Sequence, residues 1–156
     1  RALRLIGFEQ FVTGLWCRPD NLIEPTTVSF NRLISLGLDA EAILSQMEST
    51  ADGPMSNPAS LWSPEQLGTK YSEMIALVEH SQEQLEHIDF NLAMRESFLI
   101  GEHVIRQINA DPLLPDEMVD TAMRQQMVAA MRAYDAYCHP LWMQFRDRST
   151  SGDLKP

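Results

Sequence analysis

The spacing of hydrophobic positions changes along this chain and divides it into two parts. Residues 1–50 contain short apolar runs broken by turn-forming residues. Residues 63–145 instead repeat apolar side chains at the three- and four-residue intervals of amphipathic helices. Between them, residues 51–60 carry two prolines and a glycine and are the best candidate for a linker. The pattern predicts a small α+β part followed by an all-helical part.

The first part predicts two helices and two strands. Residues 1–7 predict a short helix that ends on a glycine, and residues 8–18, rich in Phe, Val, Thr and Trp, predict a strand. Pro25 begins a second helix, which ends near Gly37. Residues 40–50 are ambiguous between helix and strand. We favour a strand there, mainly because of the resemblance described below.

The second part predicts helices only. Ser63 and Pro64 form an N-terminal helix signal, with the serine as the cap and the proline in the first turn. We expect three helices, over residues 64–88, 91–109 and 119–145. Residues 111–116, Asp-Pro-Leu-Leu-Pro-Asp, predict a rigid turn between the last two. Residues 146–156 predict a polar tail that frays.

The charge of the chain argues against nucleic-acid binding by these residues. The 156 residues include 12 basic and 22 acidic side chains, which gives a formal net charge of −10. Residues 1–60 contribute −3 and the remainder −7, so neither part supplies the positive field that phosphate binding requires. Hydrophobic residues make up 44% of the chain, which is sufficient for a folded core.

The cysteines and the N-terminal residues indicate the cellular compartment in which we expect the protein. Cys17 and Cys138 lie far apart and fit neither a metal nor a redox spacing, so we expect reduced thiols in a cytoplasmic protein. No apolar run approaches the roughly 20 residues that span a bilayer, and the N-terminus does not have the pattern of a signal peptide. The chain starts without an initiator methionine, inside what looks like a helix, and we expect a processed chain or a fragment.

No catalytic or metal-binding motif is recognisable. His80 and His87 share one expected helix, yet no histidine of the chain has the Glu-x-x-His spacing of a bundle di-iron site. A solvated acidic face explains these histidines better. The chain has neither a Gly-x-Ser-x-Gly motif nor a glycine-rich phosphate loop. We therefore expect no catalytic residues, no metal and no cofactor.

The three tryptophans each fall at a predicted element boundary. Core packing or interface anchoring is the favoured role, and the wall of a pocket for an aromatic ligand is the alternative, because such pockets combine apolar walls with few polar groups. Arginine and histidine side chains could supply the polar groups. The candidate ligand-binding residues are Trp16, Arg18, Trp62, His103 and Arg106.

Residues 14–22, Gly-Leu-Trp-Cys-Arg-Pro-Asp-Asn-Leu, are the most informative stretch, because an aromatic strand end runs there directly into turn chemistry. Preceded by Gly7-Phe8, this stretch resembles the middle region of the PaaX family of bacterial transcriptional repressors. Residues 111–115, Asp-Pro-Leu-Leu-Pro, follow a helix ending Arg106-Gln-Ile and resemble that family's C-terminal domain. The resemblance runs loosely over residues 1–145.

The resemblance implies a three-part repressor with a DNA-binding winged helix, a ferredoxin-like middle domain that helps dimerise, and a helical C-terminal domain. It implies control of phenylacetate-type catabolism, with an aryl-CoA thioester releasing the repressor from its operator. For this chain it implies an incomplete ferredoxin-like domain at residues 1–55, a helical domain at 61–146 and a flexible tail at 147–156. The winged helix and the first middle-domain strand would be missing.

The resulting hypothesis is the dimerisation and effector-response part of a PaaX-like repressor. We expect a homodimer that meets operator DNA only through the missing domain and does not contact a membrane. Arg18 or Arg106 would bind the phosphates of an aryl-CoA effector, and Trp16 or Trp62 would contact its aryl group. The middle fold also resembles a CRISPR-associated nuclease family, whose catalytic aspartate would lie on the missing strand, so we infer no nuclease activity.

Two other classes of function stay open. One is a small hydrolase that uses Cys17, where the neighbouring Arg18 can lower the pKa of a thiol, or carboxylates such as Asp20 and Asp111. The other is a protein-interaction module that binds no small ligand. A structural role for the thiol is the favoured interpretation, so we expect a protein that is not an enzyme.

Overall fold

The structure is a computed structural model that describes residues 2–47 and 58–151. Its elements are α1 (Ala2–Leu5), β1 (Glu9–Val12), β2 (Leu15–Cys17), α2 (Thr26–Ser35), the 3-10 helix η1 (Pro58–Leu61), α3 (Pro64–Leu85), α4 (Phe90–Asn109) and α5 (Thr121–Thr150). The described part of the chain is therefore mostly helical, with one two-stranded antiparallel sheet, which is compatible with the predicted α+β class.

The elements separate into two compact units. Unit 1 comprises residues 1–65 and 109–121, and unit 2 comprises residues 66–108 and 122–156. The connection between α4 and α5, which the sequence analysis placed in the helical domain, thus groups with the N-terminal elements. The expected boundary between residues 55 and 61 stays a prediction, since residues 48–57 lie outside the described residues.

Unit 1 begins with a helix that closes on a glycine, as predicted. Gly7 has a φ of 82°, and its amide donates a hydrogen bond to the carbonyl of Arg4. The amide of Phe8 donates to the carbonyl of Leu3, at 3.0 Å. These two bonds form the pattern that ends a helix on a left-handed residue, so the backbone of α1 turns directly into β1.

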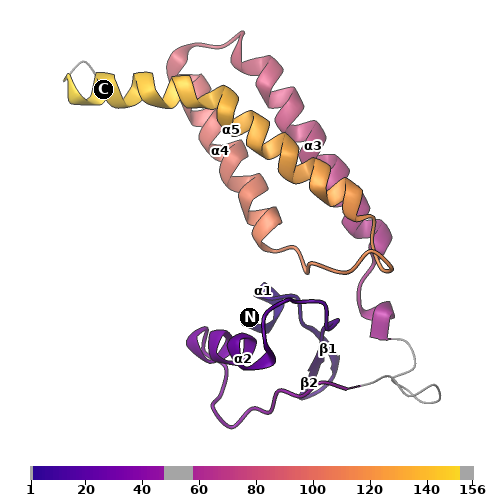
Figure 1. Cartoon of the computed structure of the whole chain (residues 1–156). Helices are drawn as coiled ribbons and strands as arrows, with labels where there is room; N and C mark the ends of the chain where they lie inside the picture. The colour runs from indigo at the N-terminus through magenta and orange to yellow at the C-terminus, as the bar shows by residue number, and fades with distance from the viewer. Residues whose placement is uncertain (1, 48–57, 152–156) are drawn as a thin grey trace. The chain divides into compact units, whose positions relative to one another are not determined.

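A β-hairpin stands where one strand was predicted over residues 8–18, and that prediction was wrong (Figure 1). β1 and β2 pair antiparallel, with Gln10 opposite Trp16. The chain reverses at Thr13 and Gly14, and Gly14 has a φ of 84°. A glycine adopts this left-handed conformation at little cost, so the aromatic and β-branched residues on either side form two short strands.

The segment after the hairpin contains one of the two elements predicted there. α2 ends as expected, with the amide of Gly37 donating to the carbonyl of Ile34 and Gly37 at a φ of 95°. The strand favoured at residues 40–50 was wrong for its described part, because residues 42–47 have no regular structure. Ile43 and Met47 are exposed, so no apolar face is buried that would dock a strand there. Residues 48–50 lie outside the described residues.

The core of unit 1 joins side chains that are far apart in the sequence. Its buried apolar residues are Phe8, Leu33, Trp62, Leu114 and Val119. The segment that supplies the last two begins with a turn in which Leu113 has a φ of 53°, a rare conformation for a leucine. The turn is held because the amide of Leu113 donates to Oδ1 of Asp111, at 2.7 Å, and its carbonyl accepts from Nδ2 of Asn21, at 2.6 Å.

Replacing Gly7 by alanine tests how closely this segment approaches the end of α1. A Cβ at Gly7 would lie 2.5 Å from the carbonyl oxygen of Pro112, a backbone atom that cannot turn aside. We expect Gly7→Ala to lower the free energy of unfolding by about 3 kcal/mol or more, because a steric clash adds to the strain of a left-handed alanine.

Gly14→Ala is the matched control, since Gly14 has nearly the same φ but nothing within 4 Å of an added Cβ. Strain alone predicts a loss of about 1 to 2 kcal/mol there. Urea unfolding followed by tryptophan fluorescence measures both. Equal losses for the two variants would contradict the close approach of Gly7 and Pro112.

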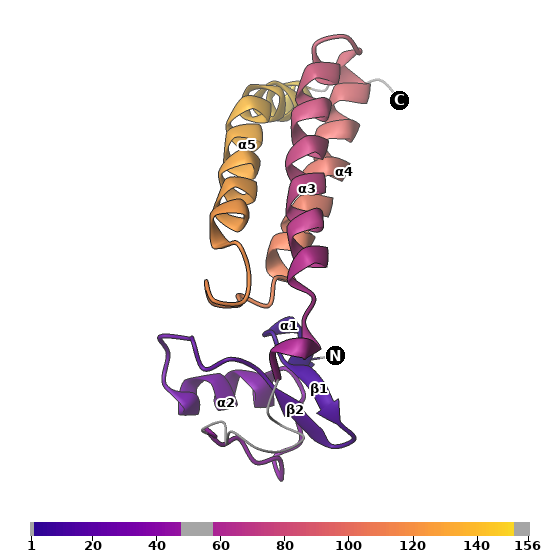
Figure 2. The same ribbon diagram turned by 90° about the vertical axis from the view of Figure 1, so that its right-hand side faces the viewer.

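Unit 2 is a bundle of α3, α4 and α5, which lie side by side in both views (Figures 1 and 2). All three helices were predicted, because their apolar side chains follow the helical period. The buried side chains of the bundle core are Tyr71, Met74, Val78, Ser81, Leu85, Ala93, Met94, Ser97, Val104, Met127, Met131, Tyr134 and Cys138. The methionines fill the irregular space between the helices.

α5 is longer than predicted and changes direction towards its C-terminal end (Figure 1). Pro140 lies inside the helix, where it removes one backbone donor and bends the axis. Residues 146–150, which were predicted to fray, are helical, so that prediction was wrong for them. The guanidinium of Arg148 lies 4.1 Å from the centre of the Phe90 ring, a cation–π contact that holds these turns against the start of α4.

A hydrogen bond between two side chains is buried in the bundle. The hydroxyls of Ser81 and Tyr134 lie 2.7 Å apart, and both residues are about 2% exposed. Burial raises the pKa of the Tyr134 phenol well above its ordinary value of 10.0, and the bond to Ser81 offsets only part of that rise. Burial also raises the pKa of the nearby Cys138 thiol. Both groups are therefore kept protonated in the folded bundle.

The raised pKa of Tyr134 predicts a loss of stability in alkali. Above pH 10 the unfolded chain releases the phenol proton while the folded bundle retains it, so the stability present below pH 10 falls as pH rises. The phenol contributes up to about 1.4 kcal/mol per pH unit to this slope. Tyr134→Phe should flatten the slope between pH 10 and 12, measured by urea unfolding with circular dichroism. Burial and a hydrogen bond to Glu86 also raise the pKa of Tyr137, though less than that of Tyr134, so Tyr137→Phe should flatten the slope less than Tyr134→Phe does.

Candidate functional site

The five candidate ligand-binding residues divide between the two units. Trp16, Arg18 and Trp62 belong to unit 1, whereas His103 and Arg106 lie on α4 in unit 2. The five residues therefore do not belong to one site within a single unit.

Arg18 is committed to contacts within unit 1. Its guanidinium donates to the backbone carbonyls of Ile6 and Pro19 and to Oδ1 of Asn21, the last at 3.2 Å. Its central carbon lies 5.8 Å from the centre of the Phe8 ring. Burial lowers the pKa of this guanidinium. The residue therefore ties the end of β2 to the end of α1, and most of its donors are occupied.

The two tryptophans of unit 1 also face the protein. Trp16 is partly buried, and the guanidinium of Arg4 lies 5.7 Å from its ring centre. Trp62 is only 8% exposed, and its indole N–H has no hydrogen-bond partner among the described residues. The Trp62 ring therefore belongs to the core of unit 1, whereas the Trp16 ring stays partly exposed beside Arg4.

The polar candidates on α4 are exposed. Arg106 forms an ion pair with Glu102 one helical turn away, and His103 lies exposed beside them. A pair with this spacing stabilises a solvent-exposed helix by a few tenths of a kcal/mol. These two residues are available to a partner, and neither of them lines the hollow on α5 that is described below.

Of the residues named for a hydrolase, Cys17 lies in β2, and Asp20 and Asp111 lie in loops. Burial raises the pKa of the Cys17 thiol, whereas a nucleophilic cysteine needs a lowered one. Oδ2 of Asp20 accepts a hydrogen bond from Gln46, at 2.9 Å, and Oδ1 of Asp111 caps the turn at Leu113. Within residues 2–47 and 58–151, no cluster of three His, Cys, Asp or Glu side chains could hold a metal.

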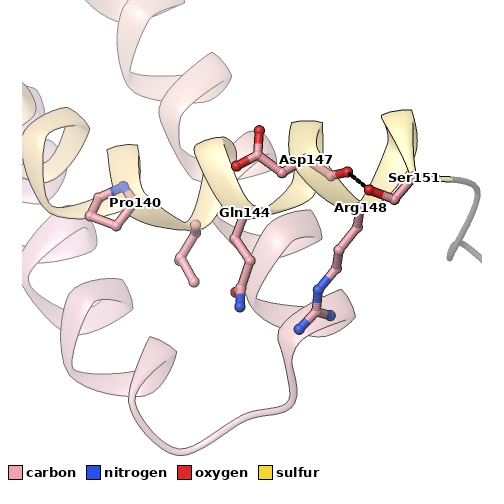
Figure 3. A pocket seen from close by; sticks show the side chains of 6 residues that line it. Pro140, Gln144, Asp147, Arg148 and Ser151 are labelled. Atoms are coloured by element: carbon pink, nitrogen blue, oxygen red, sulfur yellow. Dashed lines mark hydrogen bonds between the residues drawn. The ribbon is translucent and has the colours of Figure 1, made fainter.

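A surface hollow of about 600 Å³ lies along the C-terminal half of α5 (Figure 3). It is lined by Pro140, Leu141, Gln144, Asp147, Arg148 and Ser151. Helical periodicity explains the set, because side chains spaced three, four and seven residues apart share one side of a helix. The hollow thus exists because α5 continues past the point where the sequence analysis ended it.

The charges of the hollow favour an anion beside an apolar group. Figure 3 shows the side chains of Gln144 and Arg148 at one edge of the hollow and the carboxylate of Asp147 at the opposite edge. That carboxylate pairs with Arg146, at 3.2 Å, while Arg148 has no ion pair among the described residues. Pro140 and Leu141 supply the apolar end. The arrangement suits binding, and the Ser151 hydroxyl donates a hydrogen bond to the carbonyl of Asp147 at 2.9 Å.

Sequence reasoning missed Arg148 because the residue was assigned to a fraying tail. A signal was present: no glycine or proline interrupts residues 141–151, and Leu141, Gln144, Arg148 and Ser151 continue the helical spacing.

Comparison with known proteins adds no relative: no family model, no curated protein and no solved structure matches the chain. Within the described residues, no helix has the length and hydrophobicity required to cross a membrane.

The role of Arg18 predicts a selective loss of stability on a conservative change. Arg18→Lys keeps the charge but loses the planar fork that reaches several acceptors, so we expect it to destabilise unit 1 by about 1 to 3 kcal/mol. Arg106→Lys, on the exposed face of α4, should change stability by less than about 0.5 kcal/mol. Urea unfolding measures both. Equal effects would contradict the structural role of Arg18.

Proposed function

We propose that this chain is the dimerisation and effector-response part of a PaaX-like cytoplasmic regulator of aromatic catabolism. The hollow on α5 carries the proposal, because it places the cation of Arg148 beside the apolar Pro140 and Leu141. An aryl-CoA thioester requires a cation for its phosphates and an apolar surface for its aryl group. The net charge of −10 supports the assignment of operator binding to a different domain.

The order of elements in unit 1 supports the finer description as an incomplete ferredoxin-like domain. That fold has the order β-α-β-β-α-β, and α1, β1, β2 and α2 follow one another in the order of its four inner elements. In this interpretation unit 1 contains the first helix, the hairpin and the second helix of the motif. This likeness of order is compatible with a middle domain of the proposed regulator.

The proposed effector acts on the C-terminal part of α5. Arg148 already contacts Phe90 at the first residue of α4, and Pro140 bends α5 between the bundle core and the hollow. A phosphate bound to Arg148 would favour the arrangement in which these last turns are held. A ligand changes the populations of two states only through a difference in its affinity for them. The response would therefore consist of ordering this segment of α5.

Calorimetric titration with phenylacetyl-CoA tests the proposal. We expect heat of binding with the unmodified chain and an affinity lower by about tenfold to a hundredfold for Arg148→Gln, because a charge-assisted hydrogen bond to phosphate is lost. Arg132→Gln is the matched control, since Arg132 is an exposed arginine of the same helix outside the hollow, and it should bind like the unmodified chain.

Titrations with coenzyme A alone and with phenylacetate alone separate the two halves of the ligand. No heat with any of the three compounds would remove the effector role and favour the interaction module. Equal affinity of Arg148→Gln and the unmodified chain would place the ligand elsewhere.

A further inference from the structure

The outer face of α4 carries an apolar surface that the bundle does not cover. Four large side chains on this helix are about half exposed: Leu92 at 51%, Phe98 at 54%, Leu99 at 45% and Ile105 at 47%. The buried face of α4 lies on the opposite side, with Ala93, Ser97 and Val104. A helix that is apolar on both sides exposes hydrophobic area without a partner in its own bundle.

The surface has an ordered arrangement of charge. With 3.6 residues per turn, Leu92 and Leu99 fall on one edge of the outer face and Phe98 and Ile105 on the other. Arg95 and Glu102 lie between the two edges. We call these six residues the α4 face. The first half of the face has a cation between two apolar residues, in the order Leu92, Arg95, Phe98. The second half has an anion between two apolar residues, in the order Leu99, Glu102, Ile105.

This order is complementary to itself when reversed. We propose that the α4 face binds the α4 face of a second copy of this chain, antiparallel, about a two-fold axis between Phe98 and Leu99. In that pairing Arg95 lies level with the partner subunit's Glu102, and the partner subunit's Arg95 lies level with Glu102. Phe98 and Leu99 meet their own counterparts. A two-fold symmetric interface uses the same surface on both subunits, so that surface must be complementary to itself. Binding of a different partner does not require self-complementarity.

The neighbouring contacts leave the α4 face available. Glu102 pairs with Arg106 of its own helix, and its carboxylate has acceptor positions left for a second cation. Arg95 has no ion pair among the described residues. The rings of Phe98 and Trp142 meet in a T-shaped arrangement, with 6.2 Å between ring centres, so α5 supports the Phe98 side chain while leaving half of it exposed. The inference names the surface for the dimer of the proposed function.

Charge reversal and its repair test the pairing. Sedimentation equilibrium should show a dimer for the unmodified chain. Arg95→Glu should raise its dissociation constant about tenfold or more, because like charges then face each other twice. The double variant R95E/E102R restores both opposite pairs and should restore the dimer. Arg132→Glu, an exposed arginine outside the α4 face, should leave the dimer unchanged.

A cross-link locates the axis independently. In a Cys17→Ser background, Leu99→Cys should form a covalent dimer on oxidation, since the two Leu99 positions meet close enough for a disulfide. Ala129→Cys, at an exposed position of α5, should not. Circular dichroism confirms that each variant folds. A monomeric unmodified chain, a dimer without the Leu99 cross-link, or an unaffected R95E dimer would each overturn the inference.

The outcome is separable from that of the effector proposal. Cross-linking through Leu99 without heat from phenylacetyl-CoA supports the α4 face and rejects the effector role. Ligand binding by an unmodified chain that stays monomeric rejects the α4 face and leaves the effector role standing.

Discussion

The approach of the Pro112 backbone to Gly7 is the constraint on which unit 1 depends. A Cβ at Gly7 would lie 2.5 Å from the Pro112 carbonyl oxygen, so only a glycine leaves room for the segment that passes there. That segment contributes the buried Leu114 and Val119. A two-stranded sheet with two short helices buries too little apolar surface to be stable alone. The contact therefore brings in the apolar side chains that the N-terminal elements lack.

Besides its apolar core, unit 1 has polar contacts that end on backbone atoms. Arg18 reaches the carbonyl of Ile6, and Asn21 reaches the carbonyl of Leu113. Such bonds fix the path of the chain more strictly than apolar packing does, because a carbonyl accepts a donor only from a limited range of directions. The three helices of unit 2 share a continuous apolar core and contain a buried hydroxyl pair.

The helices were predictable from the sequence because periodicity is a local signal, and Gly7 and Gly37 ended two of them as expected. The hairpin was missed because Gly14 was taken as part of a strand, although a glycine is what allows the reversal there. The strand at residues 40–50 rested mainly on a resemblance and lacked a buried face. A strand depends on partners elsewhere in the chain, and these are not visible in its own residues.

The candidate site was harder to predict for the same reason. Arg18 lies in a stretch that looks ready for a ligand, yet its acceptors are carbonyls whose positions follow only from the fold. Arg148 looked like part of a tail, yet an aromatic ring at the start of another helix holds it in place. The identity of an arginine shows what it can bind. Which group it does bind depends on contacts between distant segments.

The discontinuity of unit 1 has a consequence for synthesis on the ribosome. The residues that contact Gly7 and Asn21 are made only after α3 and α4 have been translated. Until then the N-terminal elements lack Leu114 and Val119 and cannot complete their core. The nascent chain must therefore carry an unfinished first unit through the synthesis of the first two bundle helices. Contacts this distant in sequence slow folding, so unit 1 is completed only after both helices that separate its two segments have been made.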